Sequence, residues 1–151
     1  MPLIRLTTQI KAPIQIVFDL SRDIDFHQKC ASKTREKAIA GRTSGLIQLG
    51  ETVTWVAIHF GVKQQLTTKI TAMDAPHSFT DEMLKGAFKS IKHEHLFSHK
   101  DGITTMIDNF HFESTFGVIG QLFNSLILKK YMTRFLEERN AVIKSAAEYT
   151  V

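Results

Sequence analysis

Apolar and polar residues alternate along most of the chain up to about residue 113, in segments bounded by turn-forming residues. An alternation with a period of two is typical of a β-strand that buries one face. The pattern predicts strands at residues 3–11, 35–40, 51–60, 62–73, 78–85, 88–99 and 103–113. Two short helices are expected after the first strand, at 13–22, where Pro13 suits the first helical position, and at 24–33.

The final segment has a different pattern. Between residues 118 and 148, apolar side chains recur at helical spacing, and charged side chains, including Arg139, fall between them. This indicates a long amphipathic helix with its charged side in water. A run of antiparallel strands followed by one long helix predicts an α+β fold. The absence of repeats and linkers predicts a single domain over residues 1–151.

The dipeptide at residues 101–102 predicts how the last two strands pair. Asp-Gly between two alternating segments is a strong signal for a hairpin with a two-residue loop. Counting outward from this loop places His95 opposite Asp108 and His93 opposite Phe110. Both rows belong to the more apolar face of their strands, so we expect them to face the interior.

The preceding hairpin extends this interior row. A loop centred on Ala87 would place Asp81 opposite His93, so that each inward histidine has an aspartate across the ladder. The interior side chains expected from the strands are Leu66, Phe79, Asp81, Met83, Ile91, His93, His95, Phe97, Met106, Asp108, Phe110 and Phe112. Trp55, His59 and Gln64 join them only if the turn at Gly61 contains an even number of residues.

Four roles fit the belt formed by Asp81, His93, His95 and Asp108. In the first, each carboxylate and imidazole stabilise one another in the interior. In the second, the same groups orient an amphipathic ligand. In the third, His93 or His95, oriented by an aspartate, acts as a general acid or base. In the fourth, two histidines and an aspartate hold a metal ion. We expect no metal, because two alternating histidines in a chain with seven are a weak pattern. The histidines interpreted as surface or loop residues are His27, His77, His99 and His111.

Composition narrows the class of protein. The net charge is +4, but basic residues are scattered along the chain, so we expect no nucleic-acid partner. The apolar stretches are too short for a membrane span, and the N-terminal stretch lacks the apolar core of a signal peptide. The single cysteine, Cys30, suits a reducing compartment, and we expect a cytoplasmic location and no cofactor. A homodimer formed through the helix or an edge strand stays open.

The stretches FTDEMLKGAFKSIKHEHLF and DGITTMID, followed by the long helix, resemble the START-like (SRPBCC) superfamily. Within it, the sequence is similar to ligand-binding SRPBCC domain proteins, which are related to polyketide cyclase/dehydrase-like proteins. The most specific part of the resemblance is the spacing of Phe79, Asp81, Gly86, Phe88, His93, His95, Phe97, Gly102, Asp108, Gly117 and Gly120. One departure is Ile91, where this branch leads us to expect a tryptophan.

The resemblance implies a helix-grip fold, in which a curved antiparallel sheet wraps the C-terminal helix and leaves a deep cavity. The interior row, with Trp55, would then line this cavity together with some of Leu122, Phe123, Leu126 and Phe135 of the helix. Because this superfamily includes carriers, receptors and enzymes, the fold alone does not select a chemistry. We expect binding of a hydrophobic or amphipathic small molecule, such as a lipid, an isoprenoid or an aromatic compound. The alternatives are a cyclase or dehydratase that uses a His–Asp pair as acid and base, and a structural module with a filled interior.

Overall fold

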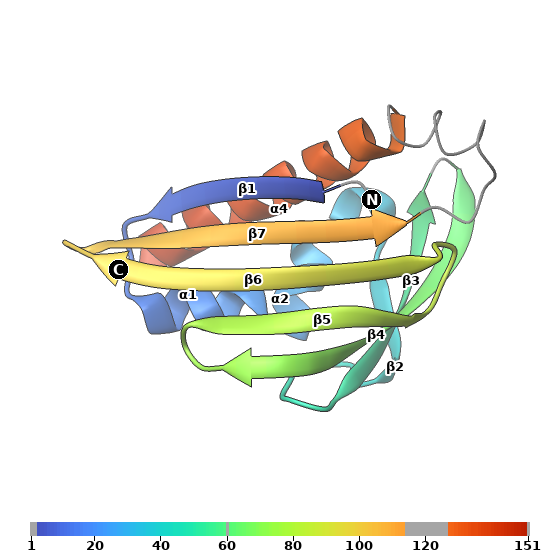
Figure 1. Ribbon diagram of the computed structural model, residues 1–151, viewed down its shortest axis with the longest axis horizontal. Coiled ribbons are helices and arrows are strands. Elements are labelled where there is room, and N and C mark those ends of the chain that lie inside the picture. The colour runs from blue at the N-terminus through green and yellow to red at the C-terminus, as the bar shows by residue number, and fades with distance from the viewer. Residues whose placement is uncertain (1–2, 60, 114–126, 151) are drawn as a thin grey trace.

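The computed structural model describes residues 3–59, 61–113 and 127–150. Within these ranges, seven antiparallel strands form one curved sheet in the order β1-β7-β6-β5-β4-β3-β2, and the helices all lie on one side of it (Figure 1). The strands are β1 (Leu3–Ile10), β2 (Lys37–Gly41), β3 (Thr52–His59), β4 (Val62–Asp74), β5 (Ser78–Lys85), β6 (Ser90–Lys100) and β7 (Ile103–Glu113). The helices are α1 (Ile14–Ser21), α2 (Ile24–Cys30), the short 3-10 helix η1 (Ser32–Thr34) and α4 (Lys129–Thr150).

The elements expected from the hydrophobic pattern are all present among the described residues. The α+β class, the two short helices after β1 and the long C-terminal helix are confirmed. The second short helix ends earlier than expected, at Cys30, and η1 follows it. The side chain of Asp23 starts this helix by accepting a hydrogen bond from the Phe26 amide, as an N-cap does. The expected first turns of the long helix, from residue 118, lie outside the described residues.

The β6–β7 hairpin has the expected register. Its loop is residues 101–102, and both have positive φ angles, 52° and 78°, as a type I′ turn requires. The Cα partner of His95 is Asp108, and that of His93 is Phe110. The β5–β6 register is also as expected, because Asp81 is the partner of His93. The sequence pattern therefore correctly predicted which side chains of β5, β6 and β7 share the concave face.

The β3–β4 hairpin meets the condition set by the sequence. His59 pairs with Val62, so two residues form the loop, and Trp55 pairs with Leu66. An even loop places Trp55, His59 and Gln64 on the same face as Leu66. These side chains extend the interior row from β5 onto β4 and β3, on the same face of the sheet.

Side chains packed between the sheet and the helices form two apolar clusters. In the larger one, the Phe18 ring of α1 packs edge-on against Phe79 and Phe97, with centroid distances of 5.6 and 5.4 Å. The second cluster contains Phe112 of β7 and Leu136 of α4. Burial of each such ring stabilises the fold by about 1.5–3 kcal/mol. No helix in the part of the chain that the structure describes is long and apolar enough to cross a membrane.

Candidate functional site

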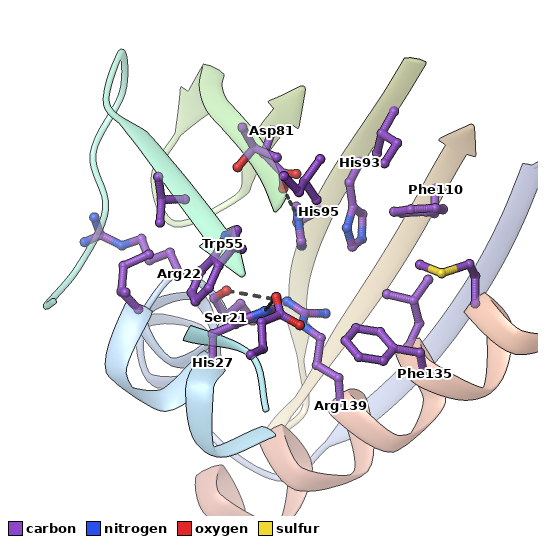
Figure 2. A pocket seen from close by; sticks show the side chains of 18 of the residues that line it. Ser21, Arg22, His27, Trp55, Asp81, His93, His95, Phe110, Phe135 and Arg139 are labelled. Carbon is purple, nitrogen blue, oxygen red and sulfur yellow. Dashed lines mark hydrogen bonds and ion pairs between the residues drawn. The ribbon is translucent and has the colours of Figure 1, made fainter. Parts of the chain in front are cut away.

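A cavity of about 400 Å³ lies between the concave face of the sheet and the helices (Figure 2). Of the side chains predicted to line it, those that do so are Trp55, Leu66, Phe79, Asp81, Ile91, His93, His95 and Phe110. His59 and Gln64, which the sequence left undecided, also line it. The predicted helix residues Leu122, Phe123 and Leu126 lie outside the described residues. Within the described part of α4, Met132, Phe135 and Leu136 contribute apolar surface to the cavity.

Five predicted lining residues do not reach the cavity. They are Met83, Phe97, Met106, Asp108 and Phe112. Phe97 and Met106 lie in the larger cluster, where α1 covers the sheet. Met83 and Phe112 pack in the second cluster. The prediction was wrong for these residues because one sheet face is shared between the packed core and the cavity, and alternation cannot separate the two.

A stack of aromatic rings forms one wall of the cavity. The His95 ring lies between Phe79 and His93, with centroid distances of 4.0 and 3.7 Å. The ring of Phe110 meets His93 edge-on at 5.2 Å. Phe79 and the two histidines are almost completely buried. The packing of these rings fixes the directions in which the imidazole nitrogens point.

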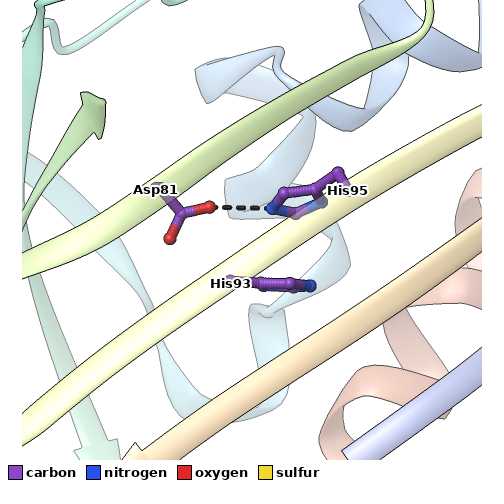
Figure 3. Close-up of side chains that lie close together, drawn as sticks. All are labelled: Asp81, His93 and His95. Atoms are coloured by element: carbon purple, nitrogen blue, oxygen red, sulfur yellow. Dashed lines mark hydrogen bonds and ion pairs between the residues drawn. The ribbon is translucent and has the colours of Figure 1, made fainter. Parts of the chain in front are cut away.

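The two histidines bind different carboxylates. His95 Nε2 lies 2.8 Å from Asp81 Oδ2, and His93 Nε2 lies 2.8 Å from Asp108 Oδ1. Figure 3 shows the Asp81–His95 contact, with the His93 ring stacked beside it. The second nitrogen of His95, Nδ1, is buried without a hydrogen-bond partner among the described residues and lies 3.7 Å from Asp108 Oδ1. Neither nitrogen of His95 is therefore open to a ligand.

Asp108 is the centre of a buried network beneath the ring stack. Besides His93, its carboxylate accepts hydrogen bonds from Arg139 Nη1 at 3.3 Å and Asn140 Nδ2 at 2.8 Å. Arg139 also donates to the Ser21 carbonyl at the end of α1. Arg139 was expected on the charged, solvated side of the helix, and this expectation is wrong, because its side chain is 5% exposed and lines the cavity. Its position in the sequence indicates the inner side of the helix, because residue 139 is four positions from both Phe135 and Ile143, which lie on that side.

These contacts set the protonation of the belt. Burial, helped by the neighbouring His93, lowers the pKa of His95 to about 4 against the opposing effect of Asp81. Burial alone would raise the pKa of Asp108, but the His93 hydrogen bond and the Arg139 guanidinium outweigh it and hold that pKa well below its usual range. The pKa of Asp81 is lowered as well, because the hydrogen bond from His95 and the nearby positive groups together outweigh burial. At neutral pH, neutral His95 therefore donates through Nε2 to an ionised Asp81.

Asp81, His93 and His95 also form the group in which a metal ion would be sought. Each offers one ligand atom, and these atoms lie within 4.8 Å of one another. However, the two imidazole rings are stacked at an interplanar angle of 26°, and their Nε2 atoms bind different carboxylates. Because a metal binds imidazole along a lone pair in the ring plane, stacked rings do not present converging ligands. The observed orientation is that of a hydrogen-bonded group.

Comparison with known proteins shows the family of the chain. The family described as "Polyketide cyclase / dehydrase and lipid transport" matches residues 1–148. The chain belongs to this family. Among curated proteins, no sequence matches significantly.

Solved structures show the fold that the family shares. A START superfamily protein from Mycobacterium smegmatis is 12% identical over 99% of both chains, with a TM-score of 0.75. The protein TTHA0849 from Thermus thermophilus is 17% identical over 97% of this chain and 99% of that one, with a TM-score of 0.74. Ginseng major latex-like protein 151 from Panax ginseng is 17% identical over 97% of both chains, with a TM-score of 0.70. The START-like helix-grip fold expected from the sequence is confirmed.

A second polar group of the cavity contains His27, which the sequence pattern did not indicate, and His59, whose inward position depended on an even turn at Gly61. His27, interpreted as a surface residue, lines the cavity, binds Glu36 through Nε2 at 2.8 Å and packs against Trp55 at 4.5 Å. His59 Nδ1 lies 2.7 Å from the Tyr131 hydroxyl of α4. No periodic signal in the short helix α2 indicates which of its sides faces the sheet, so the inward position of His27 depends on tertiary packing.

Proposed function

We propose that the protein binds a hydrophobic or amphipathic small molecule in the cavity between the sheet and α4. The observation that carries the proposal is the cavity itself, about 400 Å³, with aromatic and aliphatic walls. Protein interiors are packed as densely as organic crystals, and voids larger than a water molecule are few. A cavity of this size has no purpose in packing, but it falls in the range of small-molecule sites. The family description, which includes lipid transport, supports the same proposal.

The chain carries its own reporter for a binding test. Trp55 is the only tryptophan, and its side chain lines the cavity. A ligand that enters should change the Trp55 emission, and native mass spectrometry followed by denaturing extraction should reveal any small molecule that the protein retains. Trp55→Phe is the control for the optical signal, because a change in emission that comes from Trp55 should disappear in this variant. If no apolar or amphipathic compound changes the Trp55 emission or the melting temperature, the proposal is wrong.

The alternative is a cyclase or dehydratase, and the family description includes such enzymes. The geometry favours binding over catalysis. A general base needs a nitrogen or oxygen within reach of the substrate, and His95 offers neither of its nitrogens. His95 Nε2 is engaged by Asp81 and Nδ1 is buried, which leaves Asp81 and His93 as the acid–base candidates. Incubation with candidate substrates and analysis of the products separates the two functions. A binding protein returns its ligand unchanged, and His95→Gln alters affinity only.

We further propose that residues 1–151 act as one domain in the cytoplasm, in keeping with the single cysteine. Size-exclusion chromatography with light scattering tests whether two chains associate.

A further inference from the structure

We infer that the cavity selects ligands whose polar end donates a hydrogen bond, as an alcohol or phenol does, over ligands that end in a carboxylate. This inference rests on the proposed function and names the chemistry of its ligand. It is carried by the position of Asp81 in the cavity wall and by the charges around it.

One oxygen of Asp81 is open to the cavity. Oδ2 accepts the hydrogen bond from His95 Nε2 at 2.8 Å, whereas Oδ1 has no donor among the residues that the structure describes. The side chain of Asp81 is 21% exposed and belongs to the cavity wall. Figures 2 and 3 show the second oxygen on the side of the carboxylate that faces away from His95. A ligand therefore meets an acceptor whose position is fixed by its partner.

The charge state of Asp81 makes this oxygen an acceptor only. Burial by itself would favour the neutral acid, but the hydrogen bond from His95 and the neighbouring positive groups lower the pKa of Asp81. The carboxylate is thus ionised at neutral pH, and an ionised carboxylate has no proton to donate. A ligand hydroxyl can bind it, and a ligand carboxylate cannot.

Other negative groups surround the same space. Asp23 and Glu36 are also among the residues that line the cavity, and the Glu36 carboxylate is bound there by His27. Asp108 is fully buried beneath the ring stack, 3.7 Å from His95 Nδ1. An anionic ligand would enter a site of low dielectric that already holds several carboxylates, and repulsion between like charges is strong there.

The guanidinium groups in the described cavity wall are already engaged. Arg22 binds the Asp19 carboxylate through Nε and Nη2, and the Ile47 carbonyl through Nη1. Arg139 binds Asp108 and Asn140 through Nη1, and its Nη2 donates to a backbone carbonyl. Recruiting Arg139 to an anionic ligand would break its buried ion pair with Asp108, and recruiting Arg22 would break its partly buried ion pair with Asp19. Neither arginine is therefore available as a counter-ion.

A ligand that fills the cavity excludes water from Asp81 Oδ1. A hydroxyl at this point replaces the lost hydrogen bond. A methyl group leaves a buried charged oxygen without a partner, and a carboxylate adds a like charge. The same apolar skeleton should therefore bind with affinities set by its polar end.

The experiment compares 2-naphthol, 2-methylnaphthalene and 2-naphthoate by isothermal titration calorimetry at pH 7, where the first two are neutral and the third is an anion. The three probes share one skeleton and differ in a single substituent. With the wild-type protein, we expect 2-naphthol to bind at least about tenfold more tightly than 2-naphthoate, the effect of a hydrogen bond to a charged group. This comparison needs no substitution, so it stands even where a variant does not fold.

Asp81→Asn then tests the residue. Its side-chain oxygen can still accept from His95, which turns the amide NH₂ toward the cavity and replaces the acceptor by a donor. The preference for 2-naphthol over 2-naphthoate should fall by about tenfold or more, and the advantage over 2-methylnaphthalene should shrink with it. Glu82→Gln is the matched control, because it removes the same charge from the next residue of β5, on the other face of the sheet. It should leave the preference within about twofold of the wild type.

The outcomes separate this inference from the proposed function. Equal affinity for the three probes, or tighter binding of 2-naphthoate, would overturn the inference while the cavity remains a binding site. A preference for 2-naphthol that survives in Asp81→Asn would also overturn it, because another group would then be responsible. Failure of the folded wild type to bind any of the three would overturn the inference, whereas the proposed function fails only if no apolar or amphipathic compound binds.

Discussion

Asp108 lies directly across the β-ladder from His95, yet its carboxylate accepts a hydrogen bond from His93. His95 likewise binds Asp81, and Asp81 is the Cα partner of His93. Each hydrogen bond thus runs diagonally across the sheet, and the two imidazole rings stack between the carboxylates. Diagonal neighbours are within reach of side chains as long as histidine. The belt therefore ties β5, β6 and β7 together through side chains as well as through the backbone.

Asp108→Asn should destabilise the fold strongly. The substitution removes a fully buried negative charge that Arg139 and His93 share, and it leaves the guanidinium of Arg139 in the interior without a counter-ion. Breaking a buried ion pair by removing one partner costs about 3–5 kcal/mol. We expect the free energy of unfolding in urea to fall by this amount.

Asp101→Asn provides the control in the same hairpin. Residue 101 has a φ of 52°, a conformation that asparagine tolerates, and Asn-Gly forms the same turn type as Asp-Gly. The free energy of unfolding should change by less than about 0.5 kcal/mol. Equal losses for the two variants would show that Asp108 does not hold the network together.

The stability of the fold should depend on pH through His95. Its pKa is lowered by burial to about 4, whereas the unfolded chain has the ordinary value of about 6.5. Between these values the unfolded chain binds a proton that the folded protein does not, so the free energy of unfolding decreases as the pH falls from 6.5 to 4. The free energy of unfolding should decrease by on the order of 3 kcal/mol over this pH range.

Urea denaturation at several pH values, for the wild type and for His95→Gln, measures this dependence. Glutamine can still donate to Asp81 but does not titrate, so the decrease between pH 6.5 and 4 should be shallower in the variant. The imidazole resonances of His95 should titrate near pH 4 in the folded protein. Titration near the ordinary value, or equal pH dependence in the two proteins, would contradict the assignment.

Ile91→Trp should reduce the space for a ligand. Ile91 lines the cavity and is 6% exposed, so a larger ring at this position projects into the cavity volume. A ligand that fills the wild-type cavity should lose about tenfold or more in affinity, because overpacking costs about 1–3 kcal/mol. Leu96→Trp, on the outer face of the same strand, should bind the ligand as the wild type does. Unchanged affinity in Ile91→Trp would place the ligand elsewhere.

Two glycines with positive φ should respond differently to alanine. Gly41 and Gly50 have φ angles of 73° and 83°, so alanine is strained at both. A Cβ at Gly50 meets nothing within 4 Å, and Gly50→Ala should cost about 1–2 kcal/mol. A Cβ at Gly41 would overlap the Thr52 carbonyl, which accepts a hydrogen bond from the Arg42 amide at 2.7 Å. Gly41→Ala should therefore be clearly more destabilising in urea, and equal costs would contradict this reasoning.

Much of the sheet was predictable because alternation and one turn determine its register. The loop at 101–102 fixed the pairing of His95 with Asp108, and the even loop after His59 fixed the face of Trp55. The diagonal hydrogen bonds were not predictable, since direct and diagonal partners of His93 are both within reach of its side chain. Ring stacking against Phe79 and Phe110 selects between them, and this depends on rotamers that a pattern of residue types does not encode.

The helical side of the site was less predictable. Arg139 is charged, and a pattern analysis assigns charged residues to water unless a buried counter-ion is known. Its counter-ion, Asp108, lies 31 positions away in the sequence, on β7. His27 faces the cavity because η1 and β2 hold Glu36 beside it. Both cases depend on pairs that a local pattern cannot reveal.

The buried contact of Arg139 has a mechanical consequence for the cavity. On its C-terminal side, Ile143 and Ala147 anchor α4 in the packed core, whereas on its N-terminal side Met132 and Phe135 face the cavity. Displacing α4 at Arg139 would break a buried ion pair, but displacing the turns before it mainly exchanges apolar contacts. The helix is thus held most firmly from Arg139 onward, and a small shift of the turns before it, which pack in the second cluster, would adjust the cavity to ligands of different size while the larger cluster keeps its packing.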